Sequence, residues 1–363
     1  MRIVHLTSSL QVGGVEMLIC LLAEEGANDK DNQISVVIIN NDSDDFMLER
    51  LYRTGVTVFN LKRKRGNILN IPWYMLKLRR YLLLSGAKVL HVHNRFSMLI
   101  GYLSTLFLSI KRVYTLHAIK LYSNMLGDIL LKHFAVILSH KIIAISQAVK
   151  KDFIQGMEVP QARISVVPNG IRISEFHPQE NMNNILKIIC VGRLDHLKKG
   201  QDILIHALSL LKEQGIQFHC DLVGDGPSRK LLEDMITMND LWDYVRLQGT
   251  RLDIPELLRS SDLFVLPSRF EGFGIVIIEA MASGVPVLAS DIDSPKEIIK
   301  HGVNGYLFRS DDESDLANKI KELMRDHSKR SDLAKKGLDT AKRYSISRMY
   351  REYKEQYEAI CNE

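Results

Sequence analysis

Short apolar runs alternate with longer amphipathic stretches along most of the 363-residue chain. In the first half, runs of strand length occur at Ile3–Leu6, Val89–Val92 and Val113–Leu116, and helical patterns such as Val15–Ala27 and Ser97–Ser109 lie between them. Strands that alternate with helices are typical of a parallel sheet covered by helices. The pattern therefore predicts an α/β fold.

The alternation is interrupted once and then resumes. The interruption begins at VVPNGI, Val166–Ile171, which places proline, asparagine and glycine in succession, and it continues as a polar segment to Asn184. Such turn-forming residues indicate a hinge. The chain is therefore expected to form two α/β domains, residues 1–170 and 171–345. A final tyrosine-rich helical segment, 346–363, is expected to pack back on the first domain.

The most informative stretch is SDLFVLPSRFEGFGIVIIEAMASGVPVLAS, residues 261–290. It has the pattern of a strand, a glycine-bearing turn, a helix and a second strand. Gly272 and Gly274 allow the backbone to approach a ligand closely, and the helix behind them presents unpaired N–H groups to an anion. Glu271 lies in the turn, and Glu279 lies about one turn inside the helix with its side chain leaning back toward the same place. We interpret this stretch as a nucleotide-sugar site.

Two cations follow another strand in the motif VGRLDHLKKG, Val191–Gly200. Arg193 and Lys199 provide the positive charge that a diphosphate leaving group requires in the absence of a metal. Charge-assisted hydrogen bonds contribute roughly 1.5–3 kcal/mol each, against about 0.3–1 kcal/mol for a surface helix terminus. A solvated surface loop is the alternative. Gly224 in the motif LVGDGP has the pattern of a phosphate or nucleoside loop, or of a turn that needs glycine for backbone reasons only.

The first half offers weaker candidates. Gly13 and Gly14 lie between the first strand and the first helix, where a phosphate can meet a helix N-terminus, but the spacing lacks the GxGxxG of a dinucleotide site. His117 ends a strand at the edge where α/β sheets bind ligands, although a capping or core histidine remains possible. His91 and His93 share one face of a strand, yet without a third ligand of suitable spacing we expect no metal there.

Other metal signals are also weak. Asp291-Ile292-Asp293 matches the Asp-x-Asp pattern of metal-dependent sugar transferases, but we interpret it as a turn with helix-capping acids. The four cysteines are scattered without CxxC spacing, which argues against zinc or a disulfide framework and is typical of a reducing cytosol. We therefore predict no metal.

The net charge of +5 hides an asymmetry. Residues 1–170 contain 21 Lys and Arg against 12 Asp and Glu, and no acid occurs between Leu51 and Gly127. Within that region, Leu61–Leu84 mixes basic residues with aromatic residues and leucines, which favours an interfacial segment attracted to anionic lipid over a core helix with a solvated basic edge. No nucleic-acid-binding motif accompanies the charge. The acid-free region between Leu51 and Gly127 contains thirteen basic residues, namely Arg53, Lys62, Arg63, Lys64, Arg65, Lys77, Arg79, Arg80, Lys88, Arg95, Lys111, Arg112 and Lys120.

The expected location follows from two absences in the pattern. The amino terminus lacks the charged region and long apolar core of a signal peptide. The longest near-continuous apolar run, Ser97–Ile110, is shorter than the roughly 20 residues that span a bilayer. Together with the basic, acid-free region, these absences lead us to expect a cytoplasmic protein that is peripheral at the inner face of the membrane.

Taken together, the motifs resemble those of the retaining glycosyltransferases of family 4, of the bacterial surface-polysaccharide type. Those enzymes have the GT-B fold, in which two Rossmann-like domains with parallel sheets face a central cleft. The resemblance covers nearly the whole chain, and two glutamates with seven residues between them are its most diagnostic part. Where family members often carry Gly-Gly, this chain has Ile292, Asp293 and Ser294. The matching motifs are QVGGVE, TLHA, VVPNGI, VGRL…KKG, LVGDGP, FVLPSRFEGFGIVIIEAMASGVPVLA and HGVNGYLF.

The resemblance also implies roles for individual residues. Arg193 and Lys199 would hold the donor diphosphate, Glu271 would bind hydroxyls of the donor sugar, and Glu279 would bind the ribose. His117 would lie beside the sugar at the reaction centre. The implied catalytic set is His117, Glu271, Arg193 and Lys199, and the implied donor-binding set is Gly13, Gly14, Arg193, Lys199, Gly224, Glu271, Gly274, Ile275, Val276 and Glu279.

The implied reaction moves a hexose or N-acetylhexosamine from a nucleotide diphosphate sugar to a glycan or lipid-linked acceptor in polysaccharide biosynthesis. It would need neither metal nor cofactor, and it would retain the anomeric configuration while the leaving diphosphate helps to deprotonate the acceptor. A UDP sugar is the preferred donor, although spacing does not distinguish uracil from guanine or adenine. The alternatives are a nucleotide-sugar epimerase of the same architecture and a non-catalytic module that binds glycans or membranes.

Overall fold

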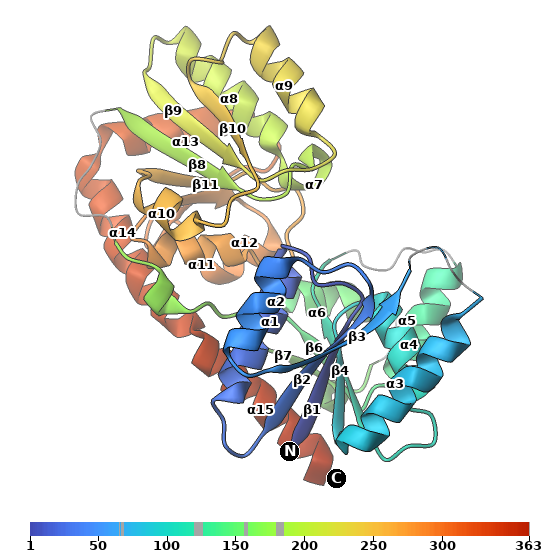
Figure 1. Cartoon of the computed structure of the whole chain (residues 1–363). Helices are drawn as coiled ribbons and strands as arrows, with labels where there is room; N and C mark the ends of the chain where they lie inside the picture. The colour runs from blue at the N-terminus through green and yellow to red at the C-terminus, as the bar shows by residue number, and fades with distance from the viewer. Residues whose placement is uncertain (65, 67–68, 120–125, 156–158, 179–184, 363) are drawn as a thin grey trace. The chain divides into compact units, whose positions relative to one another are not determined.

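The computed structural model describes residues 1–64, 66, 69–119, 126–155, 159–178 and 185–362. The chain divides into two compact units (Figure 1). The first unit consists of Met1–Gly170 together with Ile346–Glu363, and the second is Ile171–Ser345. The division falls at the expected hinge, and the final segment belongs to the first unit. Residues 179–184, which end the polar segment after the hinge, lie outside the described ranges.

The first unit is built on a seven-stranded sheet in the order β3-β2-β1-β4-β5-β6-β7, and every pairing is parallel. Its strands are β1 Arg2–Thr7, β2 Gln33–Asn40, β3 Thr57–Arg63, β4 Val89–Val92, β5 Lys111–Leu116, β6 Lys141–Ala144 and β7 Ile164–Val166. Its helices are α1 Gly14–Ala27, α2 Asp45–Arg53, α3 Ile71–Ser85, α4 Arg95–Ser104, α5 Leu126–Leu138, α6 Gln147–Ile154 and α15 Ile346–Asn362. The central strand β4 is buried throughout, as expected for a parallel sheet covered on both faces.

The predicted helix Ser97–Ser109 was too long at its carboxyl end. Helix α4 stops at Ser104, and the Thr105 hydroxyl donates to the carbonyls of Gly101 and Tyr102. Arg79 from α3 donates to the carbonyl of Ser104, so the helix end is satisfied by a side chain from another element. That interaction joins segments far apart in the sequence, and the apolar pattern alone does not contain it.

The second unit carries a six-stranded parallel sheet in the order β10-β9-β8-β11-β12-β13. Its strands are β8 Leu186–Val191, β9 Phe218–Val223, β10 Val245–Gly249, β11 Leu263–Leu266, β12 Val287–Ser290 and β13 Tyr306–Phe308. Its helices are α7 His196–Lys199, α8 Gln201–Glu213, α9 Arg229–Met238, α10 Ile254–Arg259, α11 Ile275–Ala282, α12 Asp293–Ile298, α13 Glu313–Arg325 and α14 His327–Ala341. Two Rossmann-like α/β units are thus present, and the predicted fold class is confirmed.

Strand order decides where each unit presents its functional residues. The order reverses between β1 and β4 in the first sheet and between β8 and β11 in the second. In open α/β sheets, ligands bind beyond the carboxyl ends of the strands at such a reversal. Arg193 follows β8 and Glu271 follows β11, while His93 and His117 follow β4 and β5. Candidate residues in both units therefore lie at the edges where ligands are expected.

Helix α15 completes the core of the first unit, and Figure 1 shows it in red beside the strands of that sheet. Tyr353 and Tyr357 are fully buried. Their hydroxyls lie 3.2 Å from Oγ1 of Thr115 and 2.8 Å from Nδ1 of His91, respectively. The last helix therefore supplies hydrogen-bond partners to buried polar groups on β4 and β5.

Candidate active site

The turn between β11 and α11 presents the first amides of a helix at the edge of the second sheet. Gly274 is the N-cap of α11 with φ +89°, a left-handed conformation that favours glycine. Ile275 and Val276 form the first turn and are half-buried. The amides of a first helical turn have no partner within the helix, and they carry the positive end of its dipole. This edge can therefore hold a phosphate oxygen.

Glu271 and Lys199 meet at this edge. Nζ of Lys199 lies 2.7 Å from Oε2 of Glu271, and the two side chains are 29% and 11% exposed. The Ser268 hydroxyl and the Gly272 amide also donate to the Glu271 carboxylate, at 3.4 and 3.2 Å. The structure thus brings together two residues that sequence reasoning assigned separately, one to the diphosphate and one to the sugar.

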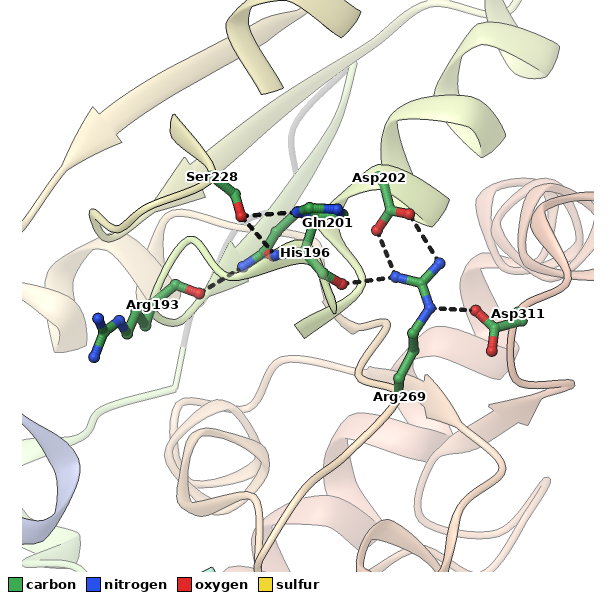
Figure 2. Close-up of polar contacts among 7 residues, drawn as sticks. All are labelled: Arg193, His196, Gln201, Asp202, Ser228, Arg269 and Asp311. Atoms are coloured by element: carbon green, nitrogen blue, oxygen red, sulfur yellow. Dashed lines mark hydrogen bonds and ion pairs between the residues drawn. The ribbon is translucent and has the colours of Figure 1, made fainter. Parts of the chain in front are cut away.

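Arg269 fixes the turn against α7 (Figure 2). Its guanidinium binds the Asp202 carboxylate through two hydrogen bonds of 2.8 Å and donates to the His196 carbonyl at 2.7 Å. A second carboxylate, that of Asp311, pairs with Nε. We call these contacts of Arg269 with Asp202, His196 and Asp311 the clamp. The Asp202 carboxylate raises the pKa of Arg269 above its ordinary value, and the guanidinium is charged at neutral pH. Sequence analysis missed Arg269, and only its place two residues before Glu271 in the turn signals it.

Arg193 differs from Lys199 in having an unengaged side chain. It is exposed, and within the described residues its guanidinium makes no ion pair or hydrogen bond. Figure 2 shows it pointing away from the neighbouring polar network, while its backbone carbonyl accepts a 2.9 Å hydrogen bond from Nε2 of Gln201. The backbone is therefore held while the charged group stays available for a ligand.

Gly224 has a packing role that the structure explains. Its φ is +129°, and a Cβ built there would lie 2.1 Å from the carbonyl oxygen of Gly192. Gly226 is also crowded, since a Cβ built there would lie 2.4 Å from the carbonyl oxygen of Leu194. The LVGDGP turn therefore needs glycine so that the β8–α7 loop carrying Arg193 can approach it. Sequence analysis left two explanations open for Gly224, contact with a ligand and a requirement of the backbone. The close approach of Gly192 is such a backbone requirement.

Glu279 is half-buried on α11. Within the described residues its carboxylate accepts no hydrogen bond. Burial, with a smaller contribution from the Glu175 carboxylate, raises the pKa of Glu279 to about 7. A carboxylate without protein partners is suited to accept hydrogen bonds from a pair of ligand hydroxyls.

Ser294 connects the next loop to the same turn. Its hydroxyl lies 2.7 Å from the carbonyl oxygen of Glu271 and 3.0 Å from that of Gly272. The predicted helix-capping role of Asp291 and Asp293 was wrong, because the N-cap is Ile292 and makes no side-chain cap. Asp291 instead pairs with Lys296 at 2.9 Å.

In the first unit, the expected phosphate site at α1 is already occupied by a carboxylate. Gly13 is the N-cap with an extended backbone, and a Cβ on it would lie 2.6 Å from Oε2 of Glu16. Burial raises the pKa of Glu16. A Cβ on Gly14 would meet no atom within 4 Å. A phosphate at this terminus would have to approach the Glu16 carboxyl.

The histidines of the first unit form a buried cluster. Nδ1 of His5 lies 2.9 Å from Nε2 of His93, and Nδ1 of His93 lies 3.2 Å from Nε2 of His117. Sequence analysis found no third metal-ligand candidate beside His91 and His93. The structure supplies one in His5, because β1 pairs with β4 and aligns His5 with His91. Among the described residues, His5, His91 and His93 form the one group with atoms close enough to hold a metal.

The basic region of the first unit is only partly exposed. Arg63 is buried and donates to Oδ1 of Asn40 at 2.9 Å, so the expectation that it forms part of an open basic face was wrong. Arg79 is also turned inward, onto the end of α4. Arg65 and Lys120 lie outside the described residues. In the part of the chain that the structure describes, no helix is both long and apolar enough to cross a membrane.

Two family models match the chain in succession. Residues 12–175 match Glycosyltransferase Family 4, and residues 173–340 match Glycosyl transferases group 1. The two matches meet at the boundary between the two structural units.

Individual proteins give the same result. An uncharacterized glycosyltransferase of Methanocaldococcus jannaschii is 30% identical over 283 residues, covering 76% of this chain and 77% of that protein. The amylovoran biosynthesis glycosyltransferase AmsK of Erwinia amylovora is 34% identical over 171 residues, 44% of this chain and 42% of that one. The crystal structure of Anabaena HepE in complex with UDP and glucose superimposes with a TM-score of 0.87 at 25% identity, covering 99% of this chain and 100% of that one.

Proposed function

Because this chain belongs to the family 4-like glycosyltransferases of GT-B fold, we propose that it transfers a hexose or N-acetylhexosamine from a UDP-linked sugar to a glycan or lipid-linked acceptor, with retention of configuration. The observation that carries the proposal is the Lys199–Glu271 pair beside the N-terminus of α11. It places a cation, a carboxylate and unpaired amides within one turn. These are the groups that a sugar diphosphate requires.

In this proposal the diphosphate binds to Lys199, Arg193 and the first amides of α11. Binding shifts Lys199 from Glu271 to phosphate oxygens, and the released carboxylate accepts hydrogen bonds from sugar hydroxyls. Glu279 accepts from the ribose. The cations then stabilise the negative charge that develops on the leaving diphosphate, which is the electrostatic contribution that usually lowers a barrier most.

The proposed chemical step breaks the bond between the anomeric carbon and the diphosphate oxygen. The acceptor hydroxyl oxygen forms the new bond on the same face, and its proton passes to a phosphate oxygen of the leaving group. No metal is needed, since Arg193 and Lys199 supply the positive charge. The complexes of HepE with UDP, UDP-glucose, or UDP and glucose support a UDP-linked donor, and AmsK supports a role in polysaccharide synthesis.

We also propose that the first unit binds an anionic membrane surface through one face of α3. Trp73, Leu76, Leu83 and Leu84 are 56%, 65%, 57% and 76% exposed. The exposed Arg80 and the half-buried Lys77, which also donates to the Leu61 carbonyl at 3.4 Å, fall on the same face, because positions 73, 76, 77, 80, 83 and 84 follow the helical repeat. An exposed face that mixes leucine and tryptophan with cations is typical of a helix lying at a lipid interface.

The reaction is tested by incubating the protein with a panel of nucleotide sugars and lipid-linked acceptors and by measuring nucleotide diphosphate release and product mass. UDP release with a product whose new linkage keeps the donor's anomeric configuration is expected. Glu271→Gln, which keeps shape and removes charge, is expected to lose transfer. An inverted sugar formed without acceptor would instead support the epimerase. The reaction proposal fails if no donor is turned over and calorimetry detects no nucleotide binding.

A further inference from the structure

The buried histidines of the first unit form a row with two open ends. His5, His93 and His117 are joined in that order by contacts of 2.9 and 3.2 Å between ring nitrogens. His5 is 1% and His93 is 3% exposed, whereas His117 is half-buried after β5. Within the described residues, neither Nε2 of His5 nor Nδ1 of His117 has a hydrogen-bond partner. The row therefore runs from the core to the sheet edge where ligands bind.

The row is uncharged. Burial lowers the pKa of His5 to about 4 and also lowers the pKa of His93 and of His117. The titratable groups packed around it are His91 on β4 and Tyr353 and Tyr357 on α15. Burial lowers the pKa of His91 and raises the pKa of both tyrosines, so none of these carries charge at neutral pH.

A neutral imidazole has one donor nitrogen and one acceptor nitrogen. Both nitrogens of His93 are engaged, so it must donate to one neighbour and accept from the other. The row therefore has only two proton arrangements. In one, His5 donates to His93, His93 donates to His117, and the proton of His117 lies on Nδ1. In the other, every donor is reversed, and Nδ1 of His117 carries a lone pair.

The interior favours the first arrangement. Reversal would place the proton of His5 on Nε2, where the described residues supply no acceptor and the ring is 1% exposed. A buried N–H without an acceptor is among the least tolerated polar groups in proteins. With the first arrangement that nitrogen carries only a lone pair.

We propose that His5 and His93 are positioning residues that hold the proton of His117 on Nδ1, so that His117 donates a hydrogen bond to a substrate oxygen and does not act as a base. The identity of that oxygen, on the transferred sugar or the acceptor, rests on the proposed function. The orientation of the row does not depend on it.

Metal binding by His5, His91 and His93 is the alternative to a hydrogen-bonded row. The ligand atoms of His5, His91 and His93 lie within 4.8 Å of one another. However, the facing nitrogens of His5 and His93 share a proton, and the two nitrogens of His91 lie 2.8 Å from the Tyr357 hydroxyl and 2.7 Å from the Thr115 hydroxyl. A metal would have to displace these hydrogen bonds, so the row is the assignment that the geometry favours.

Long-range ¹H–¹⁵N NMR of the full chain labelled at histidine tests the proposal without any substrate. The expected result is a proton on Nδ1 of His5, His93 and His117, with each ring assigned in the wild-type chain through its contacts with neighbouring residues. A proton on Nε2 of His117, or one equivalent of bound metal by elemental analysis, would overturn it. Because this measurement uses the wild-type chain, it decides the question even where a variant fails to fold.

Variants connect the row to catalysis. His5→Phe removes the donor to His93 and should mix the tautomers of His117, lowering kcat/KM about five- to tenfold. His5→Gln restores an N–H donor and should recover part of that loss, while His91→Gln, outside the row, should leave the His117 tautomer unchanged. Equal kinetics for His5→Phe and His5→Gln would count against the proposal. A correct tautomer pattern in a protein that transfers no sugar would contradict only the proposed function.

Discussion

Nζ of Lys199 lies 2.7 Å from Oε2 of Glu271, although 72 residues separate them in the sequence. Each residue neutralises the other's charge at the edge of the second sheet. A bound sugar diphosphate would replace this one contact by two. Its phosphate oxygens would bind Lys199, and its sugar hydroxyls would donate to Glu271. In the proposed function the pair therefore compensates its own charge and also supplies both groups that bind the donor.

Replacing Lys199 by alanine should lower kcat by about tenfold to a hundredfold, since one charge-assisted hydrogen bond to the leaving group is lost. The fold should persist, because Ser268 and the Gly272 amide still contact the Glu271 carboxylate. Lys198→Ala is the matched control, because its side chain is 69% exposed. Steady-state kinetics and circular dichroism measure both effects. An unchanged rate in Lys199→Ala would remove the leaving-group argument.

Glu279 should make donor binding depend on pH near neutrality. Its pKa of about 7 means that the carboxylate form, which we propose accepts two ribose hydroxyls, becomes dominant only above that pH. Donor affinity measured by calorimetry should therefore rise between pH 6 and 8 in the wild type. The same titration of Glu279→Gln should be flat through this range. An identical slope in both proteins would exclude Glu279 as the titrating group.

The Glu279 carboxyl should also make the free energy of unfolding depend on pH, but this free energy should fall with rising pH where donor affinity rises. Because its folded pKa is raised above the ordinary value of 4.5, the folded state binds the proton more tightly than the unfolded state between pH 4.5 and 7. Glu279 therefore contributes stability below pH 4.5 that is lost as pH rises to 7, at up to about 1.4 kcal/mol per pH unit. Urea unfolding of wild type and Glu279→Gln at pH 5 and 8 measures the difference. A free-energy gap between the two proteins that does not change with pH would contradict the assignment.

The histidine cluster should make the protein sensitive to acid. The folded pKa values of His5 and His117 lie below the ordinary 6.5, so these side chains add stability above pH 6.5 that is lost as pH falls toward 4. Each contributes a slope of up to about 1.4 kcal/mol per pH unit. The stability of His5→Gln should fall less steeply with acid than that of wild type. Denaturant titrations at pH 5, 6 and 7.5 test this.

Arg269→Lys should disturb the position of the β11–α11 turn, which carries Glu271. Lysine cannot reproduce the paired hydrogen bonds to Asp202, so the β11–α11 turn loses its attachment to α8. A loss of about 1–3 kcal/mol in unfolding free energy and a lower kcat are expected. Arg259→Lys, at an exposed position on α10, is the control. Full activity of Arg269→Lys would show that the clamp does not position Lys199 and Glu271.

The α3 face makes a separate prediction about membranes. Trp73→Ala combined with Lys77→Glu and Arg80→Glu should reduce co-sedimentation with vesicles containing anionic lipid while leaving turnover of water-soluble acceptors unchanged. Substitution of Arg53, which is exposed on α2 and paired with Glu49 at 2.6 Å, is the control. Equal binding to neutral and anionic vesicles would reject the electrostatic part of the proposal.

Sequence reasoning succeeded where the information is local. It placed β4 at Val89–Val92, its true bounds, and it put Glu271 in a glycine turn followed by a helix, because apolar period and turn residues are written in consecutive positions. It did not find Arg269 as the partner of Asp202, or His5 as the neighbour of His93. Those pairs lie 67 and 88 residues apart and meet only through strand order. Arg63 was misjudged for the same reason, since basic composition does not reveal which guanidinium turns inward.

The position of α15 has a consequence for biosynthesis. The second unit is one continuous segment, Ile171–Ser345, and can complete its core as soon as that segment has left the ribosome. The first unit begins earlier but cannot be finished until the final helix emerges, because Tyr353 and Tyr357 provide partners for Thr115 and His91. Domains generally complete folding in the order of synthesis. Here the order is reversed, and the first unit keeps an open core until α15, which follows the second unit in the sequence, has been translated.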